Sequence, residues 1–387
     1  MGVYFRNSFF NSGEILSDLS LILLAAGSSS RFEHPVKKQW LRTGHDPLWY
    51  FVANKMAATG LFKEIIVTSH PYEVTFMDIY GGFTVVAGGE SRQDSLKHAL
   101  ACIDTTHVMV SDIARACIDP SFLEQIISKK EKADCIVPYL RVSDTVVYGT
   151  ETIDRDGVKR IQTPQLSKTK VLRKALESDT EFTDESSAIA AIGGSRFFIE
   201  GHEDAHKLTY LTDLKQLPCL EPPASVTLTG NGFDVHAFDD KGEMVLGGVK
   251  IVSDFGFKAH SDGDVAIHAL IDALLGAAGL GDIGMLFPDS DDAYAGIDSK
   301  ILLARTVELL HRFGYIIVNA DITIAAQVPR LSPYKAQMRK VLAELLHIPP
   351  SRMNVKATTT EKLGFVGRKE GVAVLANASL NYFDWTK

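Results

Sequence analysis

The sequence is poor in cysteine. Its 387 residues include four, Cys102, Cys117, Cys135 and Cys219, scattered without close pairs. This spacing argues against a disulfide framework and against a cysteine zinc site, and it favours a reducing, cytoplasmic compartment. Long apolar runs are also missing: no stretch of roughly 20 apolar residues occurs, so we expect no membrane span. Polar residues interrupt the N-terminal stretch, which therefore lacks the apolar core of a signal peptide.

Positive charge is scarce as well. The 48 acidic residues outnumber the 40 basic residues and give a formal net charge of −8. Without a global positive field, the chain is not expected to bind nucleic acid, and an anionic ligand must be met by a local basic cluster. Hydrophobic residues make up 45% of the chain, which is enough for real cores, and the length predicts two globular domains.

The first half alternates apolar bursts with helical patterns. This order predicts an α/β domain with a doubly wound, mostly parallel sheet covered on both faces. Three prolines then fall within residues 217–225, which predicts a semi-rigid linker. We assign residues 1–18 to an N-terminal extension, 19–216 to the first domain, 217–225 to the linker and 226–387 to the second domain. Strands are expected at 19–24, 64–68, 83–86, 107–110 and 135–137, and helices from Pro47, at 91–102 and at 120–129.

The second half has a different pattern and no internal repeat of the first. Its longer segments predict an α+β domain of sheet and helices. Strands are expected at 226–230, 244–251, 315–326, 353–358 and 372–382, and helices at 262–276, 298–313 and 334–346.

Three residues of the second half have the chemistry of metal ligands. Asp234 and His236 are two residues apart, so on a strand both side chains point to one face. His268 stands in an apolar helical run. One carboxylate and two imidazoles with an open fourth position are typical of a catalytic zinc site, because structural sites are normally closed by four protein ligands. A single histidine is more often a packed core residue, and Ser261 with Asp264 also has the spacing of a helix capping box.

In the first half, small and charged residues follow the expected strands. Ala25, Ala26 and Gly27 come directly after the first strand, Arg31 and Lys38 stand further on, and no Gly-Lys-Ser/Thr ending of a P-loop is present. In an open α/β sheet, ligands bind at the carboxyl ends of the strands. Residues 88–95 follow the third strand, and Asp112 follows the fourth, where a carboxylate can hold Mg²⁺ on a triphosphate. An ordinary turn with solvated charges, and Thr183 as a helix N-cap, are the plainer interpretations.

These segments, with Arg115 and Thr163-Pro164-Gln165, resemble 2-C-methyl-D-erythritol 4-phosphate cytidylyltransferases over about residues 19–216. The resemblance implies that the phosphate oxygen of methylerythritol phosphate attacks the α-phosphorus of CTP and that pyrophosphate leaves. Ser29 stands where the family usually has a second glycine, so we expect the loop to avoid a φ that only glycine tolerates. The resemblance implies catalytic roles for Arg31, Lys38, Asp112, Arg155 and Lys207, nucleotide binding by Ala25, Ala26, Gly27, Gly89 and Ser95, and binding of methylerythritol phosphate by Thr145, Arg155 and Thr163 across a dimer interface.

The second half resembles 2-C-methyl-D-erythritol 2,4-cyclodiphosphate synthases over about residues 227–384. The motifs are residues 232–236, 260–265, 281–284, 286–289 and 356–365. The resemblance implies a trimer with active sites between subunits, where the 2-phosphate of the substrate attacks the β-phosphorus of its CDP group and expels CMP. It implies Zn²⁺ or a similar ion at Asp234, His236 and His268, Mg²⁺ or Mn²⁺ with the nucleotide phosphates near Glu361, a catalytic role for Thr359, and substrate binding by His260, Ser261, Asp282, Gly284, Ala326, Pro329, Arg330, Leu331, Thr358, Phe365 and Arg368.

The sequence therefore predicts a bifunctional enzyme that makes isoprenoid precursors from CTP and methylerythritol phosphates. In the pathway that the resemblance implies, the two reactions are not consecutive, because a kinase must phosphorylate the 2-hydroxyl between them. A dimer-forming domain joined to a trimer-forming domain predicts a larger closed homo-oligomer, such as a hexamer. Two alternatives remain open at this point: a sugar-nucleotide pyrophosphorylase joined to a metal phosphohydrolase, and a nucleotide-binding regulatory module with a structural metal. The second alternative requires a fourth protein ligand near His236 and His268.

Overall fold

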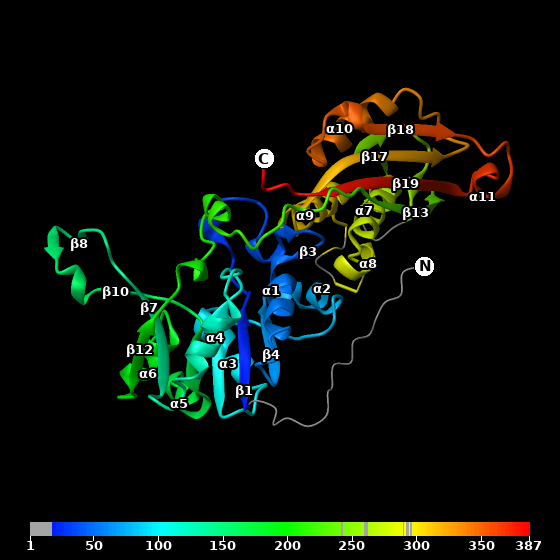
Figure 1. Cartoon of the computed structure of the whole chain (residues 1–387). Coiled ribbons are helices and arrows are strands. Elements are labelled where there is room, and N and C mark those ends of the chain that lie inside the picture. Colours follow the sequence, from blue (N-terminus) through cyan, green and yellow to red (C-terminus); the bar gives the residue numbers. More distant parts are fainter. Residues whose placement is uncertain (1–17, 241–242, 259–261, 289, 292–293, 295) are drawn as a thin grey trace. The chain divides into compact units, whose positions relative to one another are not determined.

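The computed structural model describes residues 18–240, 243–258, 262–288, 290–291, 294 and 296–387. The chain divides into two compact units, each of which is described by itself (Figure 1). The first unit contains the residues up to Ser29 and Leu48–Leu220, and the second contains Ser30–Pro47 and Glu221–Lys387. Among the described residues, no helix is both long and apolar enough to cross a membrane.

The first unit is built on an eight-stranded sheet with the order β10-β7-β11-β6-β1-β4-β5, and β12 pairs with β7. The pairs of β1 with β4 and β6, of β4 with β5, and of β7 with β12 are parallel, whereas β10 and β11 run antiparallel to their neighbours. The mostly parallel sheet is thus confirmed. Its strands are β1 (Leu19–Leu24), β4 (Glu64–Ser69), β5 (Thr84–Ala87), β6 (His107–Asp112), β7 (Cys135–Arg141), β10 (Lys159–Ile161), β11 (Gln165–Lys168) and β12 (Arg196–Glu200).

Helices pack on this sheet through apolar side chains. Ile22 and Val110 of the sheet and Leu96 and Leu172 of the helices belong to one buried core cluster, and each is at most 2% exposed. Burial of such side chains is the main favourable contribution to the fold. The helices are α1 (Leu48–Ala57), α2 (Val74–Asp78), α3 (Arg92–Leu100), α4 (Pro120–Ile127), α5 (Thr169–Ala175) and α6 (Glu185–Ala191).

Two expected helix starts differ in the structure. Pro47 ends the short strand β3 (Asp46–Pro47), and α1 begins one residue later at Leu48. The N-cap of α6 is Asp184 rather than Thr183, because the Asp184 carboxylate accepts the hydrogen bond from the Ser187 N–H. A carboxylate at this position also interacts favourably with the helix dipole.

The argument against disulfides from the scattered cysteines is wrong for one pair. Cys117 and Cys219 form a disulfide with 5.5 Å between their Cα atoms and a sequence separation of 102 residues. Sequence spacing could not reveal this pair, because the fold brings the start of the Pro-rich linker back to the loop after β6. Cys102 and Cys135 are free thiols. The expected linker is therefore tied to the first unit at Cys219.

The second unit contains a five-stranded sheet with the order β16-β13-β19-β17-β18. Only β17 and β18 are parallel; the other pairs are antiparallel. The expected strand at 244–251 is a hairpin of two short strands, and the strand expected at 226–230 extends through the metal-ligand motif to Asp239. The strands are β13 (Leu228–Asp239), β14 (Met244–Leu246), β15 (Val249–Ile251), β16 (Gly256–Phe257), β17 (Tyr315–Ala325), β18 (Met353–Thr358) and β19 (Gly371–Tyr382).

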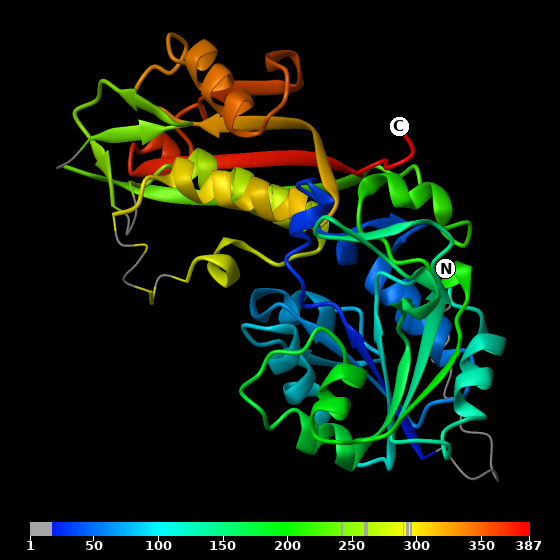
Figure 2. The same cartoon turned by 90° about the vertical axis from the view of Figure 1, so that its left-hand side faces the viewer.

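Helix α7 (Val265–Ala278) lies directly on β13 and β19 (Figure 2). A Cβ atom at Gly232 would lie 2.0 Å from the Ala269 carbonyl oxygen, so only glycine allows this close approach. Asp264 is the N-cap of α7 and accepts from the N–H groups of Ala266 and Ile267; Ser261 of the expected capping box lies outside the described residues. The other helices are α8 (Ile283–Leu286), α9 (Ser299–Arg312), α10 (Lys335–Leu345) and α11 (Gly364–Gly367).

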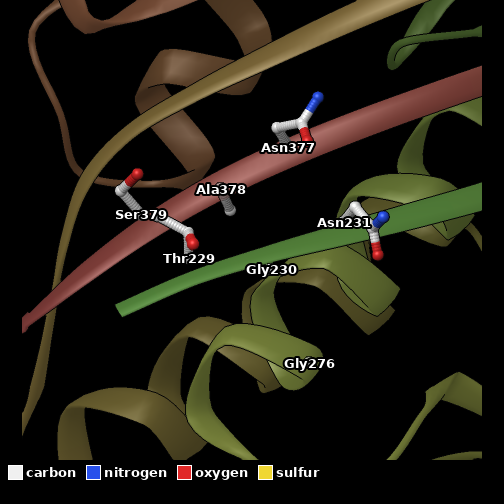
Figure 3. A pocket seen from close by; sticks show the side chains of 7 residues that line it. All are labelled: Thr229, Gly230, Asn231, Gly276, Asn377, Ala378 and Ser379. Atoms are coloured by element: carbon white, nitrogen blue, oxygen red, sulfur yellow. The ribbon is translucent and has the colours of Figure 1, made fainter. Parts of the chain in front are cut away.

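The opposite face of this sheet carries exposed side chains of β13 and β19. Phe233 is 63% exposed, and its cross-strand neighbour Leu375 is 44% exposed. Near the start of β13 and towards the end of β19, small and polar residues line a pocket (Figure 3). The pocket is lined by Thr229, Gly230, Asn231, Gly276, Asn377, Ala378 and Ser379.

Candidate active sites

The three expected metal ligands meet in the second unit. Asp234 and His236 lie on β13, and His268 lies on α7. Asp234 Oδ2 is 3.3 Å from His236 Nε2 and 3.4 Å from His268 Nδ1, and the three possible ligand atoms lie within 4.8 Å of one another. Among the described residues, no fourth His, Cys, Asp or Glu belongs to this group. The donor set and its open position therefore fit a divalent cation that must still accept a ligand.

Hydrogen bonds on the far side of each ring fix which nitrogen carries the proton. His236 Nδ1 lies 2.9 Å from the Gly263 carbonyl oxygen, which can only accept, so Nδ1 is the donor. Ser299 Oγ donates to Asp262 Oδ1 at 2.5 Å, so His268 Nε2, 3.0 Å from the same hydroxyl, must donate to Ser299. Both lone pairs consequently point towards Asp234. Neutral imidazoles held in one tautomer by such partners are typical of metal sites.

The charges of the site favour an ionised carboxylate. Burial alone would raise the pKa of Asp234, but when His236 and His268 are protonated, their hydrogen bonds and charges outweigh burial and hold that pKa well below its ordinary value. Burial lowers the pKa of His236, whereas Asp234 and the Gly263 carbonyl raise it, and the net direction is upward. A cation that takes the imidazole lone pairs must displace any proton bound there, so its affinity depends on pH.

Three acidic or hydroxyl residues around this site were given no role from the sequence. Asp262 and Ser299 form the chain to His268, and Asp272 accepts from the Ile283 N–H at 2.8 Å. Asp272 stands one helical turn after His268 on α7, and this i,i+4 spacing was a signal in the sequence. Asp262 and Ser299 are 37 residues apart, so no local pattern connects them.

The residues expected to bind the cytidine diphosphate lie partly together. The Ala326 N–H donates to the Thr358 carbonyl at 3.0 Å, which joins the ends of β17 and β18. Leu331 is buried, Arg330 is exposed, and the Thr359 hydroxyl donates to Glu361 at 2.9 Å. Glu361 does not belong to the Asp234 group. Within the described residues of one chain, the two expected cation sites are thus separate.

The other residues expected in the cyclodiphosphate synthase site lie on several different elements of the second unit. Asp282 is the N-cap of α8 and accepts from the Met285 N–H, and Gly284 is exposed in the same helix. Arg368 makes a two-point ion pair with Glu370, and Phe365 is 39% exposed. The Thr360 hydroxyl donates to the Leu363 carbonyl. His260 and Ser261 lie outside the described residues.

In the first unit, Asp112 is the centre of a polar cluster. It is the last residue of β6, and its Oδ2 accepts from Lys207 Nζ at 2.8 Å and from the Thr163 hydroxyl at 3.1 Å. Arg115 Nε donates to the same Thr163 hydroxyl at 2.8 Å, and its Nη1 donates to the Ala205 carbonyl. The fold therefore brings together three of the expected site residues, which lie on three distant segments.

The cluster has a positive surplus. Burial would raise the pKa of Asp112, but Lys207, Arg92 and Arg115 together hold it below its ordinary value. Arg92 also forms an ion pair of 2.7 Å with Glu185, whose own pKa is raised because the carboxyl is buried. Arg92 is thus already paired, whereas Lys207 and Arg115 beside the single Asp112 carboxylate leave positive charge for a polyanionic ligand.

The small-residue loop after β1 lies against the start of α3. A Cβ atom at Gly88 would be 2.6 Å from Ala26 Cβ and 2.7 Å from Ser95 Oγ, so these segments touch. The Gly89 N–H donates to Ser95 Oγ at 3.1 Å, and Ala25 is anchored to Thr68, whereas Gly27 is exposed. The expectation for Ser29 is wrong: its φ is +58°, the left-handed conformation that glycine adopts more easily.

Of four other expected residues, two lie away from the Asp112 cluster in the first unit and two belong to the second unit. Thr145 and Arg155 are exposed on an arm formed by the hairpin β8 (Val146–Tyr148) and β9 (Glu151–Ile153), where Arg155 donates to the Ser143 carbonyl at 2.5 Å. In Figure 1 this arm extends away from β7. Arg31 and Lys38 belong to the second compact unit, where Arg31 is exposed and Lys38 is half-buried.

Comparison with known proteins finds a family match for each half of the chain. A model of the 2-C-methyl-D-erythritol 4-phosphate cytidylyltransferase family matches residues 19–218, and a model of the YgbB family matches residues 227–381. The bifunctional enzyme IspD/IspF of Sulfurimonas denitrificans is 62% identical over 375 residues, which are 97% of each chain. That of Sulfurovum sp. is 55% identical over 96% of this chain and 99% of its own.

The chain belongs to the bifunctional IspD/IspF family. The structure of the bifunctional IspDF from Campylobacter jejuni is similar to it with a TM-score of 0.87 and 49% identity, and the match covers 96% of this chain and 100% of that one. The protein is accordingly an enzyme of isoprenoid-precursor biosynthesis with cytidylyltransferase and cyclodiphosphate synthase activities. Both activities and the fold class predicted from the sequence are confirmed, and the two alternative functions are set aside.

Proposed function

We propose that Asp234, His236 and His268 hold a zinc-like cation in the cyclodiphosphate synthase site. The observation that carries this proposal is the pair of imidazole lone pairs that face one carboxylate, with the ring protons engaged by the Gly263 carbonyl and Ser299. When bound, the cation draws electron density from a phosphoryl oxygen and lowers the barrier to attack on phosphorus. The protein residues hold the reacting groups in place, and the 2-phosphate of the substrate is the nucleophile.

The nucleotide of this second site is proposed to bind where β17 and β18 end. Main-chain N–H groups and the hydroxyls of Thr358 and Thr359 suit phosphate oxygens, and Arg330 adds an exposed charge. Glu361 would share a Mg²⁺ or Mn²⁺ ion with the phosphates. Since Glu361 does not belong to the Asp234 group of its own chain, we propose that one site combines Glu361 of one subunit with Asp234 of another.

The exposed face of the β13–β19 sheet supports the proposed trimer. Phe233 and Leu375 are neighbours there, and exposed apolar side chains of this size favour burial against another copy of the chain. A dimer through the first domain would let the exposed arm with Thr145 and Arg155 reach a second copy. A twofold contact of the first domain and a threefold contact of the second together give a closed hexamer. Analytical ultracentrifugation would measure its mass, and a monomer at micromolar concentration would refute the proposed assembly.

For the cytidylyltransferase site, we propose that Asp112 and Lys207 act at the triphosphate of CTP. Lys207 supplies positive charge beside the leaving pyrophosphate, and Asp112 orients Lys207 and holds Mg²⁺. Ala25–Gly27, Gly89 and Ser95 form the nucleotide cradle that the Gly88 turn brings together. Such a transfer depends on positioning and charge stabilisation rather than on a protein nucleophile.

Two assays test these assignments on the full-length protein. Pyrophosphate release from CTP and methylerythritol phosphate is expected for the wild type and is expected to be lost in Lys207→Met. CMP release from the 2-phosphorylated CDP substrate, supplied by the intervening kinase, is expected to be lost in Asp234→Asn. Each variant should keep the other activity, and an Asp234→Asn protein with full CMP release would refute the metal site. The cytoplasmic location stays a prediction, which cell fractionation would check.

A further inference from the structure

The segment Ser30–Pro47 departs from the domain order of the sequence. It connects β1 to α1 and lies inside the 19–218 match to the cytidylyltransferase family, yet it packs as part of the second compact unit. Arg31 stands in its first short helix (Ser30–Phe32), and Lys38 begins its second (Lys38–Trp40). The residues expected to stabilise the CTP triphosphate are therefore carried by a segment that is folded onto the second domain.

Aromatic stacking holds the middle of this segment. The rings of Trp40 and Phe313 are parallel within 15°, their centroids are 4.0 Å apart, and each residue is 1% exposed. The Lys37 N–H donates to the Arg312 carbonyl at 3.0 Å, at the end of α9. Gly314, with φ of +77°, leaves room for Trp40, because a Cβ atom there would be 2.8 Å from the Trp40 carbonyl oxygen. Aromatic pairs in such contact are worth more than their buried area alone.

A buried cation holds the following residues. Arg42 is 3% exposed, and its guanidinium carbon lies 5.1 Å from the ring centre of Tyr315 and 4.8 Å from that of Tyr382. Its Nη2 donates to the Tyr315 hydroxyl at 2.9 Å, and the Arg42 carbonyl accepts from Trp385 Nε1 at 2.7 Å. Cation–π contacts of desolvated arginines are among the stronger ones. All three aromatic partners belong to the second domain.

The contacts bury the aromatic side chains and Arg42 of this segment but leave Arg31 exposed. Phe32, Trp40 and Arg42 are buried, whereas Arg31 is exposed and the Lys38 ammonium lies 5.8 Å from the Phe32 ring centre. The Lys38 backbone lies between Lys37 and Trp40, both of which are attached to the end of α9. Any shift of Trp40 therefore moves Lys38, to which it is joined within one turn of helix.

We infer that Phe313, Tyr315 and Trp385 of the second domain are positioning residues for the cytidylyltransferase reaction. They fix the segment that carries Arg31 and Lys38, and this inference rests on the catalytic roles that the family resemblance implies for those two residues. The transferase thus depends on the fold of the cyclase domain even though the two reactions share no intermediate. Small misplacements of charged groups suffice to lower a rate that depends on positioning.

The main test uses Trp385→Phe, which keeps an aromatic ring and removes the donor to the Arg42 carbonyl, and Phe313→Leu, which removes the stack on Trp40. Tyr334→Phe is the matched control, since it removes one hydroxyl that accepts from the Val252 N–H elsewhere in the second unit. We expect kcat/KM for CTP to fall about fivefold in Trp385→Phe and about tenfold in Phe313→Leu. CMP release should stay within about twofold of the wild type in all three variants.

A double-mutant cycle with Lys38→Met separates positioning from general destabilisation. If Trp385 acts through Lys38, Trp385→Phe should change transferase activity by less than about twofold in the Lys38→Met background. Full additivity, an equal loss of both activities, or an unchanged transferase in Trp385→Phe and Phe313→Leu would each overturn the inference. Failure of the expected role of Lys38 is distinguishable, because Lys38→Met alone would then release pyrophosphate as fast as the wild type.

Discussion

Replacement of Ser299 by alanine tests whether the hydrogen bonds behind the metal ligands matter. Ser299 is fully buried at the start of α9 and connects Asp262 to His268. In Ser299→Ala, the Nε2–H of His268 loses its acceptor, and the imidazole becomes free to place its proton on Nδ1. That tautomer has no lone pair for a cation at the position next to Asp234, so we expect weaker metal binding.

The expected size of the effect follows from the geometry. The substitution affects one of the three metal ligands, His268. It removes the 3.0 Å hydrogen bond from His268 Nε2 to the Ser299 hydroxyl, which in turn donates to the Asp262 carboxylate. Changes of such partners typically weaken metal affinity about 10- to 100-fold, or about 1.4 to 2.7 kcal/mol. We expect the Zn²⁺ affinity of Ser299→Ala to fall within this range, and CMP release at limiting Zn²⁺ to fall with it.

The assay is a competition titration between the metal-free protein and a coloured zinc chelator at neutral pH. Thr306→Val is the matched control, because Thr306 is also a fully buried hydroxyl of α9 but donates to the Leu302 carbonyl of its own helix. Its Zn²⁺ affinity should equal that of the wild type. Equal affinities of Ser299→Ala and Thr306→Val would show that the Asp262–Ser299–His268 chain has no effect on metal binding, and the reasoning above would be refuted.

Three further predictions concern stability and thiol chemistry. Gly232→Ala would place its Cβ 2.0 Å from a carbonyl oxygen of α7, so thermal denaturation should show an unfolding free energy lower by more than about 2 kcal/mol. In the control Gly276→Ala, the nearest atom to the new Cβ is 3.8 Å away, so this change should be neutral or stabilising by about 1 kcal/mol. Equal effects of the two substitutions would contradict the close approach at Gly232. Hydrogen bonds from the backbone and side chain of Ser195 lower the pKa of Asp134 to about 2, so this stabilisation is complete above the ordinary value of 3.8 and is lost as pH falls towards 2. Asp134→Ala should therefore cost about 2 kcal/mol at pH 7, and denaturant unfolding should show a difference from wild type that shrinks between pH 4 and pH 2, where a constant difference would argue against an ionic cause. Thiol titration should detect one thiol in the native protein, two after denaturation and four after reduction, and four before reduction would contradict the Cys117–Cys219 bond.

The sequence was most informative where function depends on local spacing. Asp234 and His236 face the same side because a strand has a period of two, and the apolar run around His268 indicated the helix that lies on that strand. The mostly parallel sheet of the first half followed from the alternation of strands and helices. Asp112 was placed near the carboxyl end of its strand for the same reason.

Features that depend on the meeting of distant segments could not be predicted. Ser299 contacts His268 across 31 residues, and Cys117 meets Cys219 across 102 residues, so neither pair leaves a periodic signal. At Ser29 the prediction failed for a different reason. Its residue type argued against a left-handed φ, but the surrounding loop imposes that conformation on a serine, at a cost of order 1 kcal/mol.

The packing of Ser30–Pro47 bears on why two non-consecutive activities share one chain. Direct transfer of an intermediate cannot be the reason, because the cytidylyltransferase product must be phosphorylated before the cyclase can use it. In a separate transferase, Trp40 and Arg42 would need other partners for a large aromatic ring and a buried cation. Here those partners are Phe313, Tyr315 and Trp385, so the second domain completes the fold of a segment that belongs to the first. The inferred dependence of the transferase on these partners would give the fusion a structural reason, and selective loss of transferase activity in Trp385→Phe is the result that this dependence requires.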